Sequence, residues 1–462
     1  MEEYFVDLVT TKQKHHYVYF LKKMLNKLFP FQNQAIERLK KSLGCQLLHI
    51  GCGGGKTLTT LTFLTDKNLK RVLVIAPASL LSIWNDESEK WFGFSFIKIK
   101  GNPAQRKRIY NKRADGFYVI GYETFLRDWK YLQDFNFEAI VAEESHRMKS
   151  PVAKVTKAIL KFSRGIPIRI ALTGTAMPSG WKDIWSQVNF VHPGALYGNF
   201  YTFRNIHCIM PIPNCPAITG YREVEKIKEE IKPYVFTVPK DEIDKALPAV
   251  TYQEIKFDLS TKERKVYQQI KDELVFELKG EETTIANALG AILRLRQVVN
   301  GLFVFGQDEP SSKIQVLKDL LDSIEDDEKI IVFTMFAETA KEIQKQLNIE
   351  HIISGETVDK DSVVSSWKKE GRVLIGTKSL SEGWNCQEAR IIVNFDLPYT
   401  NAEYTQRISR CLRSGQKRPV LVYDLIAENS IDAHVKKILE KKKSMTDDFV
   451  QWTRFDIDSI LL

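Results

Sequence analysis

The stretch Cys45–Thr57, CQLLHIGCGGGKT, decides the fold of this chain, because an apolar run breaks there into a glycine cluster that ends in lysine and threonine. The pattern predicts a strand, a phosphate-binding loop and a helix that begins at Lys56. Glycines at Gly53–Gly55 allow backbone N–H groups to close around phosphate oxygens, Lys56 can reach the terminal phosphates, and the Thr57 hydroxyl can ligate Mg²⁺. The positive end of the helix dipole favours the same anion.

The loop meets only part of the longer phosphate-loop pattern, which asks for glycine where Ile50 stands. The match is therefore the shorter G-x-G-K-T core. The alternative interpretation is a glycine-rich turn that joins a strand to a helix. The choice between the two depends on the motifs that follow along the chain.

Length and composition indicate a folded protein of two or three domains, since the chain has 462 residues, of which 44% are hydrophobic and 27% are charged. The formal net charge of +9 favours a polyanionic partner, although at this length the excess is mild and also serves solubility. The N-terminus lacks an apolar signal region, and no run of about 18 apolar residues occurs. We expect a cytoplasmic protein that is neither secreted nor membrane-spanning.

Six cysteines are scattered along the chain without a C-x-x-C pair, which is typical of a reduced intracellular protein. His207, Cys208 and Cys215 fit no common zinc spacing and lack a fourth ligand. We therefore expect no structural metal. The sequence does not determine the oligomeric state.

Two series of short apolar runs alternate with helical patterns. The first series is QLLHI, RVLVIA, FIKIK, FYVI, AIVA and IRIAL, and the second is KIIVFT, EHIIS, RVLIG, ARIIVNF and PVLVYDL. Such alternation predicts an α/β fold with parallel sheets in two lobes. We expect residues 241–300 to be mostly helical, with PKDEIDKALPAV crossing between the lobes. The predicted divisions are an N-terminal segment (1–28), lobe 1 (29–245), lobe 2 (246–440) and a tail (441–462).

Two adjacent carboxylates, Glu143 and Glu144, follow the predicted strand AIVA. A carboxylate pair at the end of a parallel strand is where a nucleoside triphosphatase holds Mg²⁺ and orients the attacking water. Glu144 would orient the water and Glu143 would be the outer ligand of the metal. The alternative interpretation is a solvated acidic turn ahead of a helix.

Two further motifs offer groups that could act on a nucleotide. LTGT, which ends at Thr175, presents the hydroxyls of Thr173 and Thr175 as sensors, although alone it is a weak turn signal. Gln406, Arg410 and Arg413 have the i, i+4 and i+7 spacing of one helical face. Guanidinium groups can clamp a γ-phosphate, but a face rich in arginine is more often solvated or paired with acids.

In this order, the phosphate loop, E-E-S-H, LTGT and Q-x-x-R-x-x-R resemble the motifs of superfamily 2 helicases and translocases. Within that superfamily, the chain is most similar to the Swi/Snf-type DNA translocases, from about Leu28 to Val435. The stretches that carry this likeness are LFPFQ, VLVIAPASLLSIWNDESEKW, YETF, LTGTAMPSGWKDIWSQVNFVHPGAL, LPAVTYQEIKFDLSTKERKVY, LRLRQVVN and SEGWN.

The resemblance implies two RecA-like lobes with ATP and Mg²⁺ in the cleft between them. By this likeness Gln32 would read the adenine, His146 would couple hydrolysis to movement, and Arg410 and Arg413 would be arginine fingers. The same likeness assigns contacts with a DNA strand to Pro77, Ser79, Tyr122 and Glu123, and it places Thr377 and Gly383 in the motif that links DNA to the nucleotide.

Three residues depart from the family pattern: Glu143 stands in place of Asp, Ser145 in place of Ala, and Ala176 in place of Pro. The extra methylene of Glu143 moves the carboxylate by about 1.5 Å. Because Mg²⁺ requires near-octahedral geometry, we expect slower or weaker use of the metal.

The expected function is that of an ATP-dependent motor that grips the phosphates of duplex, forked or branched DNA without reading its sequence. The long insertions and flanking modules of chromatin remodellers are absent from this sequence, so the likeness favours compact fork-remodelling enzymes, including phage branch-migration helicases. This likeness implies a protein that works in a bacterial or phage-infected cytoplasm. The alternatives are an RNA helicase, the motor subunit of a restriction system, and an ATP-gated clamp in which Glu143 has impaired hydrolysis.

Overall fold

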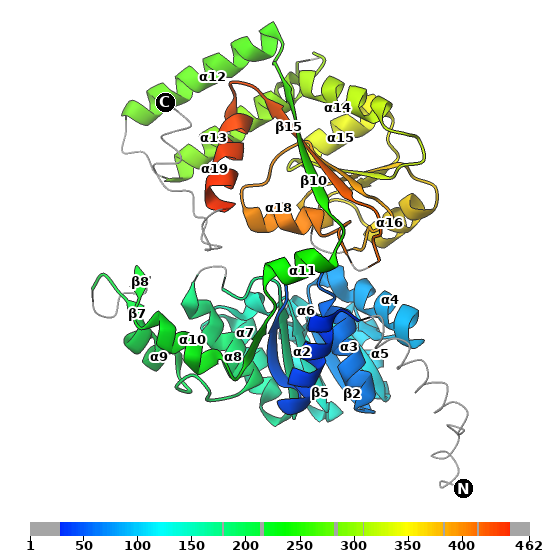
Figure 1. The fold of residues 1–462 in the computed structure, drawn as a ribbon, viewed down its shortest axis with the longest axis vertical. Coiled ribbons are helices and arrows are strands. Elements are labelled where there is room, and N and C mark those ends of the chain that lie inside the picture. Colours follow the sequence, from blue (N-terminus) through cyan, green and yellow to red (C-terminus); the bar gives the residue numbers. More distant parts are fainter. Residues whose placement is uncertain are drawn as a thin grey trace.

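The computed structural model describes residues 28–177, 180–212, 217–280, 285–307, 309–381, 384–413 and 415–443. These residues form two α/β lobes, one above the other in Figure 1, and each lobe is built around a parallel sheet. The predicted fold class is confirmed. The N-terminal segment and the tail that we predicted lie almost wholly outside the described residues.

Within the described part of the chain, the main sheet of lobe 1 has seven parallel strands in the order β3-β4-β2-β5-β6-β1-β9. Six of them contain the predicted apolar runs, and β9 is an edge strand too short for its periodicity to show. The bounds are β1 Cys45–His49, β2 Arg71–Ala76, β3 Ile97–Ile99, β4 Gly116–Gly121, β5 Ala139–Glu143, β6 Ile168–Thr173 and β9 Val235–Thr237.

Side chains of the central strands alternate between two apolar cores, as the two-residue period of a strand requires. Val72 and Val74 of β2 face the core that contains α2, α3 and α4, whereas Leu73 and Ile75 face the core that contains α5 to α8. The helices of lobe 1 are α2 Pro30–Lys41, α3 Lys56–Asp66, α4 Leu81–Phe92, α5 Pro103–Lys112, α6 Tyr122–Leu132, α7 Lys154–Phe162, α8 Ile184–Val191, α9 Phe200–His207 and α10 Val224–Ile231; the short strands β7 Cys208–Ile209 and β8 Gly220–Tyr221 form a separate hairpin.

The sheet of lobe 2 has the order β10-β15-β14-β11-β13-β12, and all its pairs are parallel. Its strands are β10 Val250–Phe257, β11 Ile330–Phe333, β12 His351–Ile353, β13 Val373–Gly376, β14 Ile391–Asn394 and β15 Val420–Ala427. Its helices are α12 Thr261–Gly280, α13 Ile285–Asn300, α14 Ser312–Ser323, α15 Ala337–Leu347, α16 Lys360–Lys369, α17 Lys378–Ser381, α18 Asn401–Ile408 and α19 Ile431–Lys443. Among the described helices, none is long and apolar enough to cross a lipid bilayer.

Residues 241–300 are mostly helical, as predicted, since α11 (Lys240–Ala246), α12 and α13 fill most of this range, but strand β10 was not expected there. Val250–Phe257 pairs with β15 along its full length, but as an edge strand it leaves most of its side chains exposed. An exposed edge strand tolerates charged residues, so its composition resembles that of a solvated helix.

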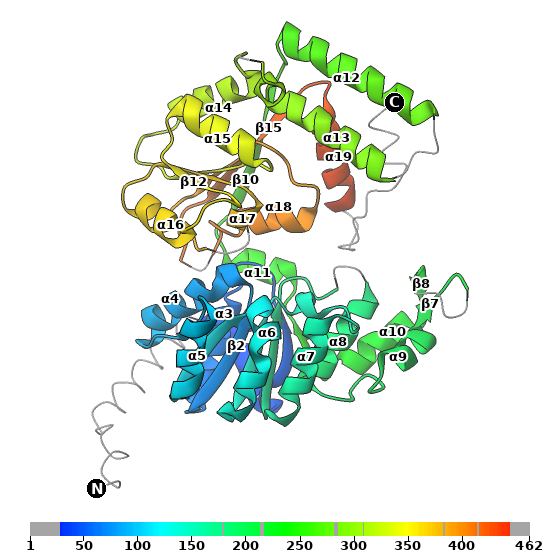
Figure 2. The ribbon, with the colours of Figure 1, turned by 180° about the vertical axis from the view of Figure 1, so that it is seen from behind.

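The site described below is positioned by the shared direction of the strands in lobe 1. The carboxyl ends of parallel strands form one edge of a sheet, and this edge faces lobe 2. The phosphate loop follows β1 there, Glu143 ends β5, and Thr173 ends β6. Helix α11, Lys240–Ala246, lies between the two lobes in both views (Figures 1 and 2).

Lobe 2 carries a buried ionic cluster under its sheet. The Lys313 ammonium lies 2.5 Å from a carboxylate oxygen of Asp432 and 4.0 Å from one of Asp396, and all three side chains are almost fully buried. Burial acts to raise the pKa of Asp396, but the charges of Lys313 and Arg296 and a hydrogen bond from Thr334 hold it below its usual value. The Asp396 carboxylate is therefore ionised and depends on the cations beside it.

We expect Lys313→Ala to destabilise the protein by roughly 3–5 kcal/mol, because it takes the ion-pair partner from the buried Asp432 and one of two nearby cations from the buried Asp396. Denaturant unfolding of the full chain measures this change. Lys345→Ala is the control, since Lys345 is an exposed partner 3.9 Å from Glu342 and such pairs contribute about 0–1 kcal/mol. Equal effects of the two substitutions would contradict a structural role for the cluster.

Candidate functional site

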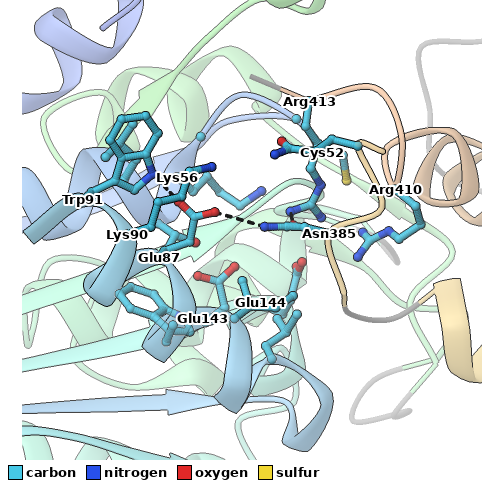
Figure 3. A pocket seen from close by; sticks show the side chains of 18 residues that line it. Cys52, Lys56, Glu87, Lys90, Trp91, Glu143, Glu144, Asn385, Arg410 and Arg413 are labelled. Atoms are coloured by element: carbon cyan, nitrogen blue, oxygen red, sulfur yellow. Dashed lines mark hydrogen bonds between the residues drawn. The ribbon is translucent and has the colours of Figure 1, made fainter. Parts of the chain in front are cut away.

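A pocket opens between the lobes at the carboxyl edge of the first sheet (Figure 3). Its non-protein space is about 880 Å³, part of which is open solvent, and this is the size range of ligand sites. The lining comes from the phosphate loop, α4 and the end of β5 in lobe 1, and from two loops of lobe 2. The residues are Cys52, Gly53, Gly55, Lys56, Thr57, Leu58, Leu80, Ile83, Trp84, Glu87, Lys90, Trp91, Glu143, Glu144, Asn385, Gln387, Arg410 and Arg413.

The phosphate loop requires glycine for both its conformation and its packing. Gly53 and Gly55 have φ of 79° and 73°, in the left-handed region that other residues rarely adopt. A Cβ on Gly54 would lie 2.5 Å from the Ile50 side chain, and one on Gly55 would collide with the amide of Gln32. The loop is thus held in a fixed shape directly ahead of α3, which begins at Lys56.

The donors of this loop suit a polyphosphate. Backbone N–H groups at the start of α3 and the Lys56 ammonium gather at the pocket, and the Lys56 ammonium donates a hydrogen bond to the Ile50 carbonyl at 3.1 Å. Thr57 adds a hydroxyl beside them. A triphosphate is therefore the ligand class that these groups fit best.

Gln32 lies against the loop and is not among the residues that line the pocket. Its side-chain amide donates to the Gly54 carbonyl at 3.0 Å and accepts from the Phe29 N–H at 2.9 Å. The side chain is almost fully buried. In this structure Gln32 therefore braces the phosphate loop, a role that sequence reasoning missed.

Glu143 and Glu144 both reach the pocket because the chain turns sharply after β5. Glu144 has φ of 51°, a left-handed conformation that is costly for a side chain of this size and is typical of functional sites. Burial raises the pKa of Glu143, and the neighbouring Glu144 charge adds to this effect. For Glu144, the hydrogen bond with His146 and the charge of Lys56 outweigh burial, so its pKa is lowered.

The oxygen groups at the base of the pocket fit a magnesium ion. Within the part of the chain that the structure describes, one carboxylate oxygen of Glu143 has no hydrogen-bond partner, and the Thr57 hydroxyl lines the same pocket. No group of three or more His, Cys, Asp or Glu side chains that could hold a metal occurs among the described residues. A site with one carboxylate and one hydroxyl matches Mg²⁺, which usually completes its shell with phosphate oxygens and water.

A hydrogen-bonded chain joins the second carboxylate to the end of β6. A ring nitrogen of His146 lies 3.3 Å from the Glu144 carboxylate and 3.1 Å from the Thr173 hydroxyl. The Thr175 N–H donates to the same hydroxyl at 3.0 Å. The structure thus brings together all four residues that the sequence predicted for this part of the site.

A second, fully buried connection runs beside the first. The Ser145 hydroxyl donates to the Gln187 amide oxygen at 2.7 Å, and the Gln187 amide nitrogen donates to the Ala176 carbonyl at 2.6 Å. Ser145 and Ala176 are two of the departures from the family pattern, so Gln187 links them. Sequence reasoning missed Gln187, because α8 also contains the buried polar residues Ser186 and Asn189 and no local pattern distinguishes Gln187 from them.

The helical face predicted for Gln406, Arg410 and Arg413 is wrong, because α18 ends at Ile408. The Arg410 carbonyl accepts a hydrogen bond from the Cys386 N–H at 3.0 Å, which draws the chain away from the helix axis. Both arginines still line the pocket. Gln406 does not, and its backbone carbonyl accepts from the Arg410 guanidinium at 3.1 Å.

The residues expected to contact DNA are mostly buried. Pro77 and Thr377 are buried, and the Tyr122 hydroxyl donates to the Glu143 carbonyl at 2.9 Å. Tyr122 is 3% exposed, so it has almost no surface to offer a nucleic acid in this structure. Ser79 is half-buried, and Gly383 lies outside the described residues.

Sequence reasoning also missed the contribution of α4. Leu80, Ile83, Glu87 and Trp91 line the pocket at helical spacing from or just ahead of this helix. The signal was a carboxylate, Glu87, within an otherwise apolar stripe.

Comparison with known families matches the SNF2-related domain at residues 17–304 and the helicase conserved C-terminal domain at residues 312–415. Two relatives are an uncharacterised ATP-dependent helicase of Mycoplasma genitalium, 26% identical over 91% of this chain, and the ATP-dependent helicase brm of Drosophila melanogaster, 25% identical over 87% of this chain. The chain spans only 42% and 28% of the length of these relatives.

Among solved structures, the SWI2/SNF2 ATPase core of Sulfolobus solfataricus in complex with double-stranded DNA is 25% identical to this chain. The match covers 92% of both chains with a TM-score of 0.45. The same core domain without DNA gives a TM-score of 0.42 over 92% of this chain and 90% of that one.

The buried link through Gln187 predicts non-additive losses of stability. Ser145→Ala leaves the Gln187 amide oxygen buried without a donor, which costs about 1–3 kcal/mol. Gln187→Leu should cost at least as much, because it also removes the donor to the Ala176 carbonyl. In denaturant unfolding we expect the double variant to lose about 1 kcal/mol less than the sum of the two single variants. Strict additivity would show that the hydrogen bond contributes nothing.

Proposed function

The chain belongs to the SNF2-related family of superfamily 2, and from this membership we propose that it is a DNA-dependent ATPase that moves along duplex DNA. One observation carries the proposal: the phosphate loop and both carboxylates of lobe 1 meet Arg410 and Arg413 of lobe 2 in a single pocket. Lobe 1 supplies the phosphate loop and the carboxylates, and lobe 2 supplies the arginines. The rate of hydrolysis can therefore depend on the relative position of the two lobes.

In the proposed reaction, ATP binds with its phosphates at Gly53–Gly55 and the Lys56 ammonium. Thr57 and Glu143 would hold Mg²⁺, which neutralises charge on the phosphates. Glu144 orients the attacking water, and its lowered pKa keeps it ionised and able to accept a hydrogen bond at neutral pH. The arginines of lobe 2 stabilise the charge that develops on the transferred phosphoryl group.

Coupling to DNA would pass through the loops at the same edge of the sheet. Pro77 follows β2 and Tyr122 follows β4, and the hydrogen bond from Tyr122 reaches the backbone of Glu143. A shift of the loop that holds Tyr122 would therefore act on the backbone of Glu143.

We extend the proposal to remodelling of forks and branched junctions, with contacts mainly to phosphates. The net charge of +9 supports a polyanionic partner, and the resemblance of the motif stretches to duplex-tracking translocases supports a double-stranded track. The test compares ATPase stimulation and strand movement on different nucleic acids.

Lys56→Ala should abolish ATP hydrolysis and leave DNA binding nearly unchanged, because Lys56 faces the phosphate site. Phosphate release and DNA binding, each measured at one salt concentration, check this prediction. Lys67→Ala is the matched control, since Lys67 is an exposed lysine at the far end of the same helix. DNA-stimulated turnover that survives in Lys56→Ala would remove the phosphate-loop assignment.

Substrate preference is decided by a panel of four-way junction, fork, blunt duplex, single-stranded DNA and RNA. We expect the junction and fork to stimulate ATPase most and to be moved. For each neutralised phosphate, the logarithm of the binding constant should fall by about 0.9 per tenfold rise in salt concentration on duplex DNA. On single strands the corresponding fall should be about 0.7.

Other outcomes select the alternatives. Stimulation by RNA alone would indicate an RNA helicase, and full stimulation by single strands with junctions unmoved would indicate an ordinary single-strand helicase. ATP binding without turnover on any nucleic acid would indicate a clamp.

A further inference from the structure

Among the described residues, two hydrogen bonds join helix α4 of lobe 1 to lobe 2. One joins the Ser82 hydroxyl to the Asp361 carboxylate at 2.8 Å. The other joins the Asn385 amide nitrogen to the Glu87 carboxylate at 3.0 Å. Both depend on the present approach of the lobes, because each has one partner in each lobe.

Glu87 is fixed from its own helix as well. One carboxylate oxygen accepts the bond from Asn385, and the other accepts from the Trp91 indole N–H at 2.8 Å. Figure 3 shows this carboxylate between the Trp91 ring and Asn385. With both oxygens engaged, Glu87 is a rigid acceptor for lobe 2.

Asn385 passes this constraint to an arginine. Its amide oxygen accepts a hydrogen bond from the Arg413 guanidinium, while its amide nitrogen donates to Glu87. Because a side-chain amide is planar, fixing the nitrogen also fixes the oxygen. A further hydrogen bond from Arg413 to the Ser409 carbonyl at 2.7 Å holds the guanidinium from its own loop.

The charge of Glu87 also acts on Arg413, in addition to the hydrogen bonds through Asn385. Arg413 shares the pocket with Arg410, and burial together with this like charge lowers the pKa of Arg413 to about 10. The Glu87 carboxylate opposes this effect. Glu87 therefore supplies both the position and part of the compensating charge for an arginine in a crowded basic site.

We propose that Glu87 is a positioning residue for ATP hydrolysis, which acts through Asn385 to set Arg413 only when the lobes are closed. The inference rests on the proposed ATPase function. The position of Arg413 would then depend on whether lobe 2 is close enough for Asn385 to bond Glu87 of α4. Removal of Glu87 should therefore impair turnover more than nucleotide binding.

The test is steady-state DNA-stimulated ATPase of Glu87→Ala, Glu87→Gln and Ser82→Ala in the full chain. We expect Glu87→Ala to lower kcat by about 10²-fold, the loss associated with a 1 Å misplacement, and to change KM for ATP by less than about threefold. Glu87→Gln keeps one oxygen acceptor for Asn385 but loses the charge and the second acceptor, so it should recover part of the loss. Ser82→Ala, which removes the hydrogen bond from α4 to Asp361, should stay within about threefold of the unsubstituted protein in kcat.

A double variant tests the route. Glu87→Ala combined with Arg413→Ala should turn over no more slowly than Arg413→Ala alone. The reason is that Glu87 is proposed to act only through the position of the Arg413 guanidinium, which Arg413→Ala has already removed. Three results would overturn the proposal: additive losses in the double variant, an equal loss in Ser82→Ala, or a rise in KM with kcat unchanged.

A measurement without turnover separates this inference from the proposed function. If the unsubstituted protein hydrolyses no ATP on any nucleic acid, the proposed function fails. The connection is then judged by the denaturation midpoints of the same variants without nucleotide. A combined shift smaller than the sum of the Glu87→Ala and Arg413→Ala shifts supports the link, and simple addition rejects it.

Discussion

A side chain at Gly53, Gly54 or Gly55 would collide with atoms from three separate parts of the chain. The Leu412 carbonyl of lobe 2 would lie 2.7 Å from a Cβ on Gly53, while Ile50 and the Gln32 amide occupy the space beside Gly54 and Gly55. The loop is therefore shaped by α2, by the end of β1 and by lobe 2 together. Everything else in the pocket is placed with respect to this loop, because it fixes where phosphates can lie.

The two carboxylates next to this loop differ through their surroundings. Glu144 is held ionised by its bond to His146 and by the Lys56 charge, whereas the pKa of Glu143 is raised by burial. Because their pKa values are shifted in opposite directions, the two carboxylates can have different roles. Glu144 can accept a hydrogen bond from water, whereas Glu143 can exchange a proton for a cation. The carboxylate of Glu143 is thus buried where its charge is costly, and a bound proton or cation offsets that cost.

Sequence patterns predicted the strands that are buried on both faces of a sheet. They did not predict local structure that depends on contacts with residues distant in the chain. The buried strands β1, β2, β5 and β6 appear as apolar runs, and the glycine loop is evident from spacing alone. The end of α18 is followed by a hydrogen bond from the Cys386 N–H to the Arg410 carbonyl. Cys386 lies 24 positions earlier in the chain, so no local sequence pattern shows this contact. Gln32, Gln187 and Glu87 were missed as structural contacts for the same reason, because their partners lie in other elements.

The linker between the lobes adds a further connection to the phosphate loop. Ile243 of α11 would lie 3.1 Å from a Cβ on Gly51, and Leu247 just beyond α11 would lie 3.1 Å from one on Gly53. Gly53 therefore lies between the linker on one side and the Leu412 carbonyl on the other, both of which move if lobe 2 moves. Because a packed contact has few intermediate arrangements, displacement of lobe 2 must either reshape the loop or release it. In the proposed motor, nucleotide binding and lobe position are thus coupled at the loop itself, before the arginines take part.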